Sequence, residues 1–285
     1  MDIDDFDKKY AIIIYSILIL TITFFTIVHH LFPWILSVPD ANLGPYLFPE
    51  NLRLFELIFW DSTAIILSTI LYHYMIKKHG FWLASLFLTG SVIFTGLEEC
   101  MWIYGGRFGW TYPTYFFTKA GLWFFDIPVY TCLGWFILAY CCVFIAEKLT
   151  EQKKVILTAG LGGLFAVMVD LWIDPLNVNL GEIALNTGAK GNWVWEMTNT
   201  LDIFSIPFMN FLGWFLVIFL FAALWGKVRI KFENNEWDKK KGTLIFYGMI
   251  PLLLLTCLIT LYSVEMFIIK PFFANINIPF PVGEL

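Results

Sequence analysis

The sequence predicts an all-α, polytopic integral membrane protein: one transmembrane domain, residues 1–285, built as a helical bundle of about seven transmembrane helices. Three observations lead to this prediction. The chain is 59% hydrophobic and only 14% charged, whereas soluble domains carry about 25% charged residues. It contains seven apolar runs near the roughly 20 residues that a helix needs to cross a bilayer. The acidic residues inside these runs gather toward one face of the membrane.

The apolar runs define the spans in chain order. The first run is too long for a cleaved signal peptide and lacks a small-residue cleavage site, so we expect it to remain as a helix. The second, third and fifth runs contain acids, so their boundaries are less sharply defined. Their length and hydrophobicity nevertheless predict that they cross the membrane. The predicted spans are 10–36, 55–76, 81–104, 121–146, 155–173, 203–226 and 244–269.

The distribution of lysine and arginine predicts the orientation, because these residues are retained on the cytoplasmic side. The N-terminal tail and the segments 77–80, 147–154 and 227–242 together hold 13 of the 18 basic residues. We therefore expect a multi-pass protein of the cell membrane with a cytoplasmic N-terminus and an external C-terminus. The long external segment 174–202 contains two tryptophans, which favours an ordered loop seated at the interface.

An internal repeat is visible in the sequence. Residues 127–136 (IPVYTCLGWF) return as residues 206–215 (IPFMNFLGWF), at an offset of 79 residues, with Pro, Gly and Trp in register. Each copy opens a span, and each follows a span that carries acids. We interpret this as a parallel repeat of two helix pairs, spans three and four and spans five and six, a common way of building a central site in membrane proteins. Convergence of common interfacial residues is the alternative.

Ionisable residues within the hydrocarbon region are costly and therefore mark candidate functional sites. Asp61, Glu98, Glu99 and Asn210 fall at depths of roughly 7 to 11 Å from the outer end of their spans, at 1.5 Å per residue. Asp170 and Asp174 share one helix face, with Pro175 predicted to end that helix. Because Glu98 and Glu99 are about 100 degrees apart on a helix, we expect at most one to point squarely at the site.

Simpler roles compete with function at several positions. Asp61 lies beside Ser62 and Thr63 and could be a hydrogen-bonded packing residue. Asp126, Asp202 and Glu265 lie near helix ends, where capping or headgroup contact is the usual role, and His29 and His30 fit an interfacial position.

The residue inventory also excludes several classes of protein. Four histidines are too few for a membrane di-iron enzyme, the last span has no internal lysine for a retinal Schiff base, and no Gly-rich phosphate loop occurs. We expect no metal, no cofactor and no nucleic-acid partner. What remains is an aromatic-rich pocket with carboxylic acids. Burial keeps the proton on such an acid, which suits protonation of an alkene in a lipid.

The motifs resemble those of one family. They are Glu98-Glu99 followed by Phe108-Gly109 and Tyr112, then Asp170-x-x-x-Asp174-Pro175, then Trp193-x-Trp195-Glu196, then Pro207-x-x-Asn210-x-x-Gly213-Trp214. In this order they resemble the membrane carotenoid 1,2-hydratases, the family of bisanhydrobacterioruberin hydratase and gamma-carotene 1'-hydratase. The likeness extends over about residues 90–220.

The resemblance implies cofactor-free addition of water across the terminal double bond of an acyclic carotenoid, giving a tertiary alcohol. In the mechanism that we expect, Glu98 or Glu99 protonates the alkene, and Asp170 or Asp174 with Asn210 positions the water and takes its proton. Aromatic faces stabilise the cation. The expected partners are the carotenoid, water, membrane lipid and, as candidates, other carotenoid biosynthesis enzymes. The predicted substrate-binding residues are Asp61, Trp102, Phe108, Tyr112, Trp193, Trp195 and Trp214.

Three rival functions are compatible with parts of the sequence. A carotenoid cyclase also begins with alkene protonation, but leaves the mass of the pigment unchanged. A prenyltransferase would use Asp170-x-x-x-Asp174 for magnesium diphosphate, but the second aspartate motif of that class is missing. A proton-coupled transporter or lipid-binding protein could use the repeat and the buried acids without any chemical change.

Overall fold

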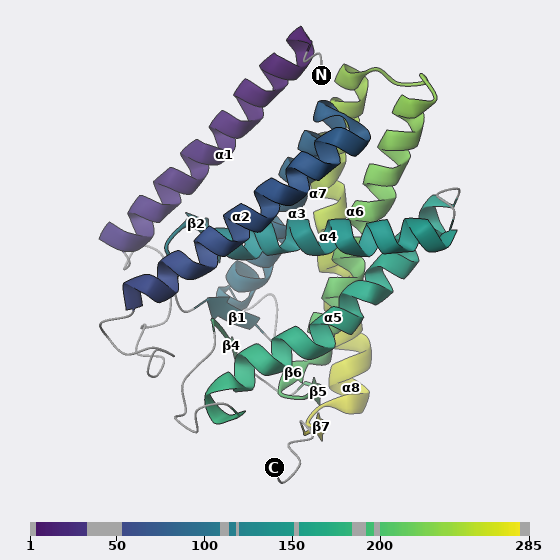
Figure 1. Ribbon diagram of the computed structural model, residues 1–285. Helices are drawn as coiled ribbons and strands as arrows, with labels where there is room; N and C mark the ends of the chain where they lie inside the picture. Colours follow the sequence, from purple (N-terminus) through teal and green to yellow (C-terminus); the bar gives the residue numbers. More distant parts are fainter. Residues whose placement is uncertain are drawn as a thin grey trace.

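The computed structural model describes residues 4–32, 53–108, 114–117, 120–150, 154–183, 192–196 and 200–279. Seven long helices dominate these residues (Figure 1), in agreement with the predicted all-α membrane bundle. They are α1 (Asp5–Leu31), α2 (Arg53–His79), α3 (Phe81–Arg107), α4 (Val129–Thr150), α5 (Val155–Ile183), α6 (Phe208–Glu233) and α7 (Lys239–Val264). A π-helical turn (Glu265–Ile269) and the short helix α8 (Lys270–Phe273) continue α7.

Six helices among the described residues are long and apolar enough to cross a membrane, and α2 is the long helix outside this group. The chain is thus a multi-pass membrane protein. In α2 the apolar run is interrupted by Asp61 and by a Tyr-His-Tyr stretch, residues 72–74. An acid within a long apolar helix usually faces the protein interior, and Asp61 is only 5% exposed.

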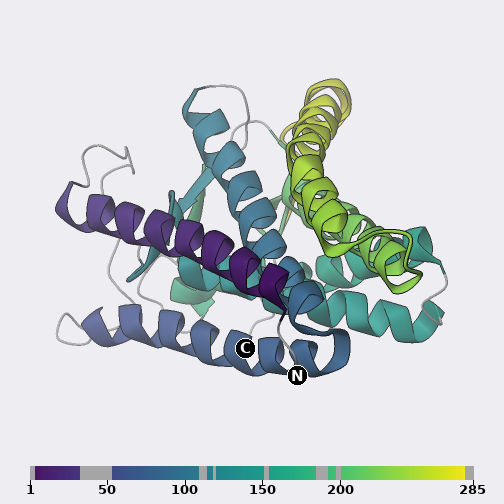
Figure 2. The same ribbon diagram turned by 90° about the horizontal axis from the view of Figure 1, so that it is seen from above.

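Helix α3 forms the centre of the bundle. Figure 2 shows it between the α1 and α2 side and the α6 and α7 side. In its most apolar stretch 78% of the residues are buried, compared with 6% in α1, which faces outward along most of its length. The core around α3 consists largely of aromatic rings, and Phe87 contacts Phe221 and Trp225 edge to face at centroid distances of 4.9 and 5.0 Å. Such edge-to-face pairs are a favoured aromatic geometry.

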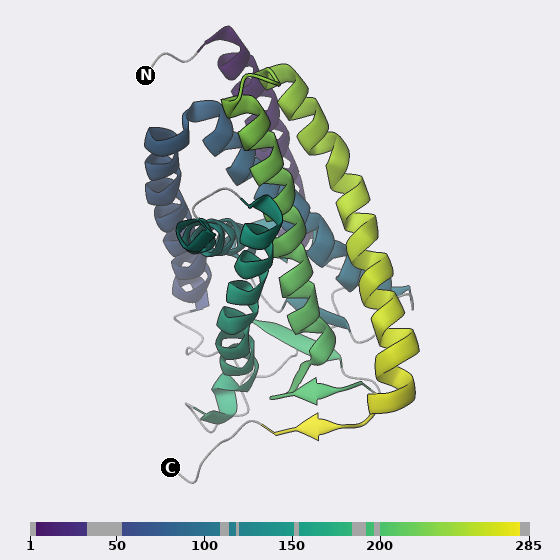
Figure 3. The same cartoon turned by 90° about the vertical axis from the view of Figure 1, so that its right-hand side faces the viewer.

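Short strands gather at the end of the bundle opposite the starts of α1 and α7 (Figures 1 and 3). They are β1 (Thr114–Phe117), β2 (Trp123–Phe124), β3 (Ile127–Pro128), β4 (Trp193–Glu196), β5 (Asp202–Ile203), β6 (Ile206–Pro207) and β7 (Asn277–Ile278). β2 and β3 form one hairpin, and β5 and β6 form another that also pairs in parallel with β7. At the other end, Lys239 Nζ binds Asp4 and Asp7 at 2.7 and 2.8 Å and joins the start of α7 to that of α1.

The hairpins change the boundaries of two predicted spans. The runs predicted to span from 121 and from 203 begin as hairpins, and their helices start at Val129 and Phe208. An apolar run looks the same in a buried hairpin as in a helix, so hydropathy does not separate them. The prediction that Pro175 ends its helix was wrong, because α5 continues to Ile183. Neighbouring groups can satisfy the backbone around a proline in a membrane helix.

The strands strengthen the interpretation of an internal repeat. Adding 79 to the bounds of β1, β2 and β3 gives the bounds of β4, β5 and β6, and α4 and α6 start at equivalent positions. β1 and β4 pair antiparallel, with Thr114 opposite Glu196 and Phe117 opposite Trp193. This register pairs the first residue of each strand with the last residue of the other, as a two-fold axis between the repeats requires.

A buried charge cluster joins α1 to the first hairpin. Asp126, in the turn between β2 and β3, lies 2.5 Å from Arg107 Nη1 and 3.1 Å from His29 Nε2. His29 also stacks on Trp123, with ring centroids 3.9 Å apart. Burial alone raises the pKa of Asp126, but the contact with His29 and the charge of Arg107 outweigh it and hold this pKa below its usual range.

We expect Asp126→Asn to make the detergent-solubilised protein less stable at neutral pH and less sensitive to acid. A carboxyl group whose pKa is lowered by folding stabilises the fold above its unfolded pKa, and this contribution is lost as pH falls through its folded pKa. The thermal midpoint of the wild type should therefore fall as pH is lowered from about 6 to about 3, and that of the variant should fall less. Equal pH profiles for both proteins would contradict this role.

Candidate active site

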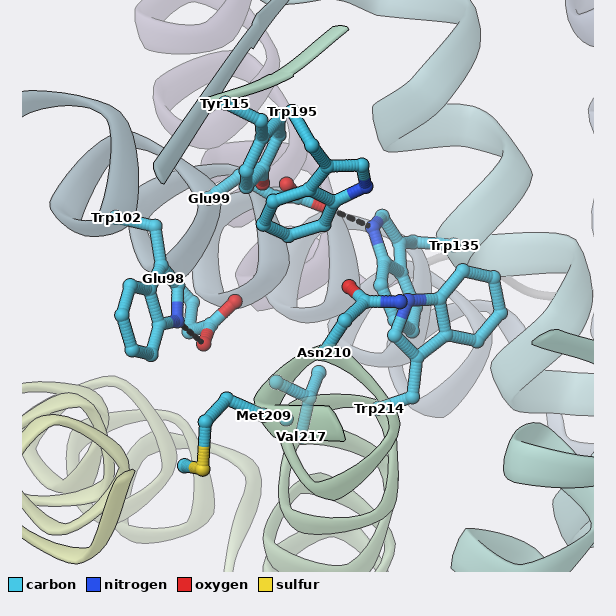
Figure 4. A pocket seen from close by; sticks show the side chains of 11 residues that line it. Glu98, Glu99, Trp102, Tyr115, Trp135, Trp195, Met209, Asn210, Trp214 and Val217 are labelled. Atoms are coloured by element: carbon cyan, nitrogen blue, oxygen red, sulfur yellow. Dashed lines mark hydrogen bonds between the residues drawn. The ribbon is translucent and has the colours of Figure 1, made fainter. Parts of the chain in front are cut away.

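A small cavity lies between α3, α4, α6 and the paired strands β1 and β4. Its volume is about 30 Å³, which gives room for about two water molecules. Polar groups and aromatic rings surround it (Figure 4). The described residues that line it are Glu98, Glu99, Trp102, Tyr115, Trp135, Trp195, Met209, Asn210, Gly213, Trp214 and Val217.

Two adjacent glutamates of α3 both line this cavity, so the expectation that at most one would face the site was wrong. Glu98 is 4% exposed and Glu99 8% exposed. Trp102 Nε1 donates to Glu98 Oε1 at 2.9 Å, and Trp135 Nε1 donates to Glu99 Oε1 at 2.7 Å. An indole can only donate, so Oε2 of each glutamate is the better place for a proton.

The two carboxyl groups have different surroundings. Figure 4 shows Glu98 together with Trp102 and Met209. Glu98 is also close enough to Cys257 of α7 for an electrostatic interaction. Glu99 lies on the Trp135 side and interacts electrostatically with Asp174 of α5. The Glu98 side is therefore the more apolar one, and the Glu99 side faces further acids.

Asn210 separates these further acids from the cavity. Its Nδ2 donates to Asp170 Oδ2 at 2.8 Å and to Asp174 Oδ2 at 2.7 Å. Asp170 and Asp174 are 0% and 3% exposed and are absent from the lining of the cavity, whereas Asn210 lines it. Since both amide hydrogens are used on the aspartates, the orientation of the amide is settled, and its oxygen is the atom that it presents to the cavity.

Aromatic rings from both repeats close the cavity. Trp135 and Trp214 occupy equivalent positions in the two repeats and contact each other with ring centroids 4.4 Å apart. Tyr115 of β1 contacts Trp195 of β4 at 4.5 Å. The faces of such rings can stabilise a cation, most strongly where water is excluded.

Residues 60–278, which include every residue lining the cavity, match the sequence model of a family described as carotenoid biosynthesis protein. The chain belongs to this family. No curated protein and no solved structure matched the chain. Membership gives the chain a role in carotenoid biosynthesis.

The other predicted site residues of this carotenoid biosynthesis protein that the structure describes lie outside the cavity lining. Asp61 Oδ2 accepts a hydrogen bond from Leu122 N at 2.9 Å and so holds α2 to the segment before β2. Trp193 of β4 lies beside Phe117 of β1, with ring centroids 6.1 Å apart. Phe108 follows α3 and is 67% exposed. Tyr112 lies outside the described residues.

Five lining residues were missing from the predicted site: Tyr115, Trp135, Met209, Gly213 and Val217. The repeat contained the signal for Trp135, because it aligns with Trp214, which had been predicted. Gly213 belongs to the motif Pro207-x-x-Asn210-x-x-Gly213-Trp214, but no role in the site was predicted for it. Within the described residues no three His, Cys, Asp or Glu side chains are grouped as a metal site.

Proposed function

We propose that this protein adds water across the terminal double bond of an acyclic carotenoid end group and releases a tertiary alcohol. The observation that supports this most directly is the pair of buried glutamates in a water-sized, aromatic cavity. The family places the chain in carotenoid biosynthesis, where a polyene end offers an alkene but no more polar reactive group.

In the proposed reaction Glu98 is the acid. Two neighbouring carboxyl groups repel each other as anions, so the pair keeps at least one proton, and the proposal places this proton on Glu98. No described Lys, Arg or His side chain lines the cavity. The π electrons of the alkene form a bond to the proton of Glu98 at the less substituted carbon. The more substituted carbon becomes a tertiary cation facing the indoles.

Glu99 is the base of the proposed reaction. A water molecule held near Asn210 donates an oxygen lone pair to the cation and forms the C–O bond. The proton that this water then loses passes to the carboxylate of Glu99. The neighbouring glutamates exchange one proton between turnovers, so addition of one water balances without a cofactor.

Access to the site follows from its location near the strand end of the bundle. With the basic ends of the helices in the cytoplasm, we propose that the N-terminus is cytoplasmic and that the cavity lies toward the external face. Water reaches it from that face while the polyene remains in lipid. The cavity has room for water but not for a branched end group, so substrate binding has to widen it. The half-buried Trp102 and Trp195 are the wall residues that we expect to turn.

Pigment mass tests the proposal. The full chain is expressed in a host that makes an acyclic carotenoid such as lycopene, and the pigments are compared by chromatography and mass spectrometry with those of an empty-vector control. We expect each modified end to gain the mass of one water molecule, with heavy oxygen incorporated from labelled water. A new pigment of unchanged mass would instead indicate a cyclase, and an unaltered pigment profile would contradict both reactions.

A further inference from the structure

One face of α6 carries an asparagine next to a glycine where it borders the cavity. Asn210 and Gly213 are three residues apart and both line the cavity. Residues at this spacing are neighbours on a helix surface. Together they place a hydrogen-bond acceptor beside an open space.

The acceptor is held rigidly. Asp170 and Asp174 take both hydrogens of the Asn210 amide at 2.8 and 2.7 Å, from the adjacent helix α5. Rotation of the amide would break both bonds and leave two buried carboxyl groups facing an oxygen. The amide oxygen therefore stays directed at the cavity (Figure 4).

The open space depends on Gly213. A Cβ atom built at this position would approach one neighbouring atom, Leu261 Cδ1, at 3.8 Å, which is ordinary van der Waals contact. Packing of α6 against α7 thus tolerates alanine. A methyl group there would take about the room of one water molecule from a cavity that holds about two.

We propose that Asn210 and Gly213 form the binding niche of the nucleophilic water, and that this niche determines whether the cation is hydrated or instead loses a proton or cyclises. The inference rests on the proposed function and identifies the product-determining part of the same site. Asn210 contacts the water, whereas Asp170 and Asp174 are positioning residues that act through the amide. Without the water, the cation returns a proton from a neighbouring carbon to a carboxylate, and the product has the mass of the substrate.

The repeat supplies a matched control. Gly134 is the equivalent of Gly213 in the first repeat, but it is exposed, and a Cβ atom there would meet nothing within 4 Å. Alanine at 134 therefore changes the same residue type at the same helix position without entering the cavity.

The experiment measures the hydrated share of the modified carotenoid for Gly213→Ala, Gly134→Ala and the wild type, at matched levels of protein in the membrane. We expect Gly213→Ala to keep consuming substrate while its hydrated share falls by about tenfold or more, because excluding one small group is worth about this factor. Products of unchanged mass should appear in its place, and Gly134→Ala should match the wild type. An unchanged hydrated share in Gly213→Ala, or an equal loss in Gly134→Ala, would overturn the inference.

A second set of variants tests the positioning role. The double variant Asp170→Asn with Asp174→Asn retains oxygens that can accept from Asn210, so we expect it to lose less of its hydrated share than a variant that removes an acceptor. Asp174→Leu removes one acceptor and should lower that share. If the double variant loses hydration as severely as Asp174→Leu, an aspartate takes the proton itself and the inference is wrong. If the wild type gives no hydrated pigment at all, the proposed function is wrong, and the inference that rests on it is wrong as well.

Discussion

Glu98→Gln is expected to leave the polyene substrate almost unconsumed. Glutamine keeps an oxygen that accepts the 2.9 Å hydrogen bond from Trp102 Nε1, so the local packing is preserved. It carries no acidic proton, and no cation forms. Because a general acid contributes roughly 10²- to 10⁴-fold to a rate, substrate loss measured in timed pigment extracts should slow by that order.

Glu236→Gln is a suitable control for this variant. Glu236 is exposed and follows the end of α6. It pairs with Lys231 in the last turn of α6, at the opposite end of this helix from the cavity. Its replacement should leave both the rate and the products unchanged. Consumption by Glu98→Gln at the wild-type rate would show that the acid is a different residue.

Glu99→Gln is expected to lower the yield of hydrated product more than the rate of alkene protonation. Its oxygen can still accept the 2.7 Å hydrogen bond from Trp135 Nε1, and Glu98 can still protonate the alkene. An amide does not take the proton of the attacking water, so hydrated product should fall by roughly 10²-fold or more. Isomers with the mass of the substrate should form instead, visible in the same chromatograms.

The contrast between the two glutamine variants assigns the roles. Loss of all conversion in Glu98→Gln together with mass-neutral products in Glu99→Gln supports Glu98 as acid and Glu99 as base. The reverse pattern would exchange the two roles. Equal hydrated yields from both variants would remove the pair from the mechanism.

Much of the fold could be predicted from consecutive residues. Hydropathy identified the helical membrane bundle, and the matching segments 127–136 and 206–215 indicated a repeat whose strands β1–β3 and β4–β6 follow the same offset. The ends of the spans were less predictable. An apolar hairpin such as β2–β3 has the same composition as the helix that follows it, so a hydropathy sum over a window includes both.

The convergence of side chains could be predicted only in part. The acids Glu98, Glu99, Asp170 and Asp174 and the amide of Asn210 stood out because polar groups in hydrocarbon are costly. Asp61 stood out for the same reason, although its hydrogen bond goes to the backbone of Leu122. The free-energy cost of a polar group in hydrocarbon does not by itself distinguish a residue that lines a cavity from one that joins two segments.

The sequence by itself determined that this chain is a helical membrane protein with a repeat and a limited set of buried acids, because composition and periodicity are properties of neighbouring residues. Only the tertiary structure decided that both glutamates face one cavity, that Trp135 meets Trp214, and that Asn210 stands between this cavity and the two aspartates. These relations depend on how α3, α4, α5 and α6 pack against one another, which brings together residues far apart in the chain.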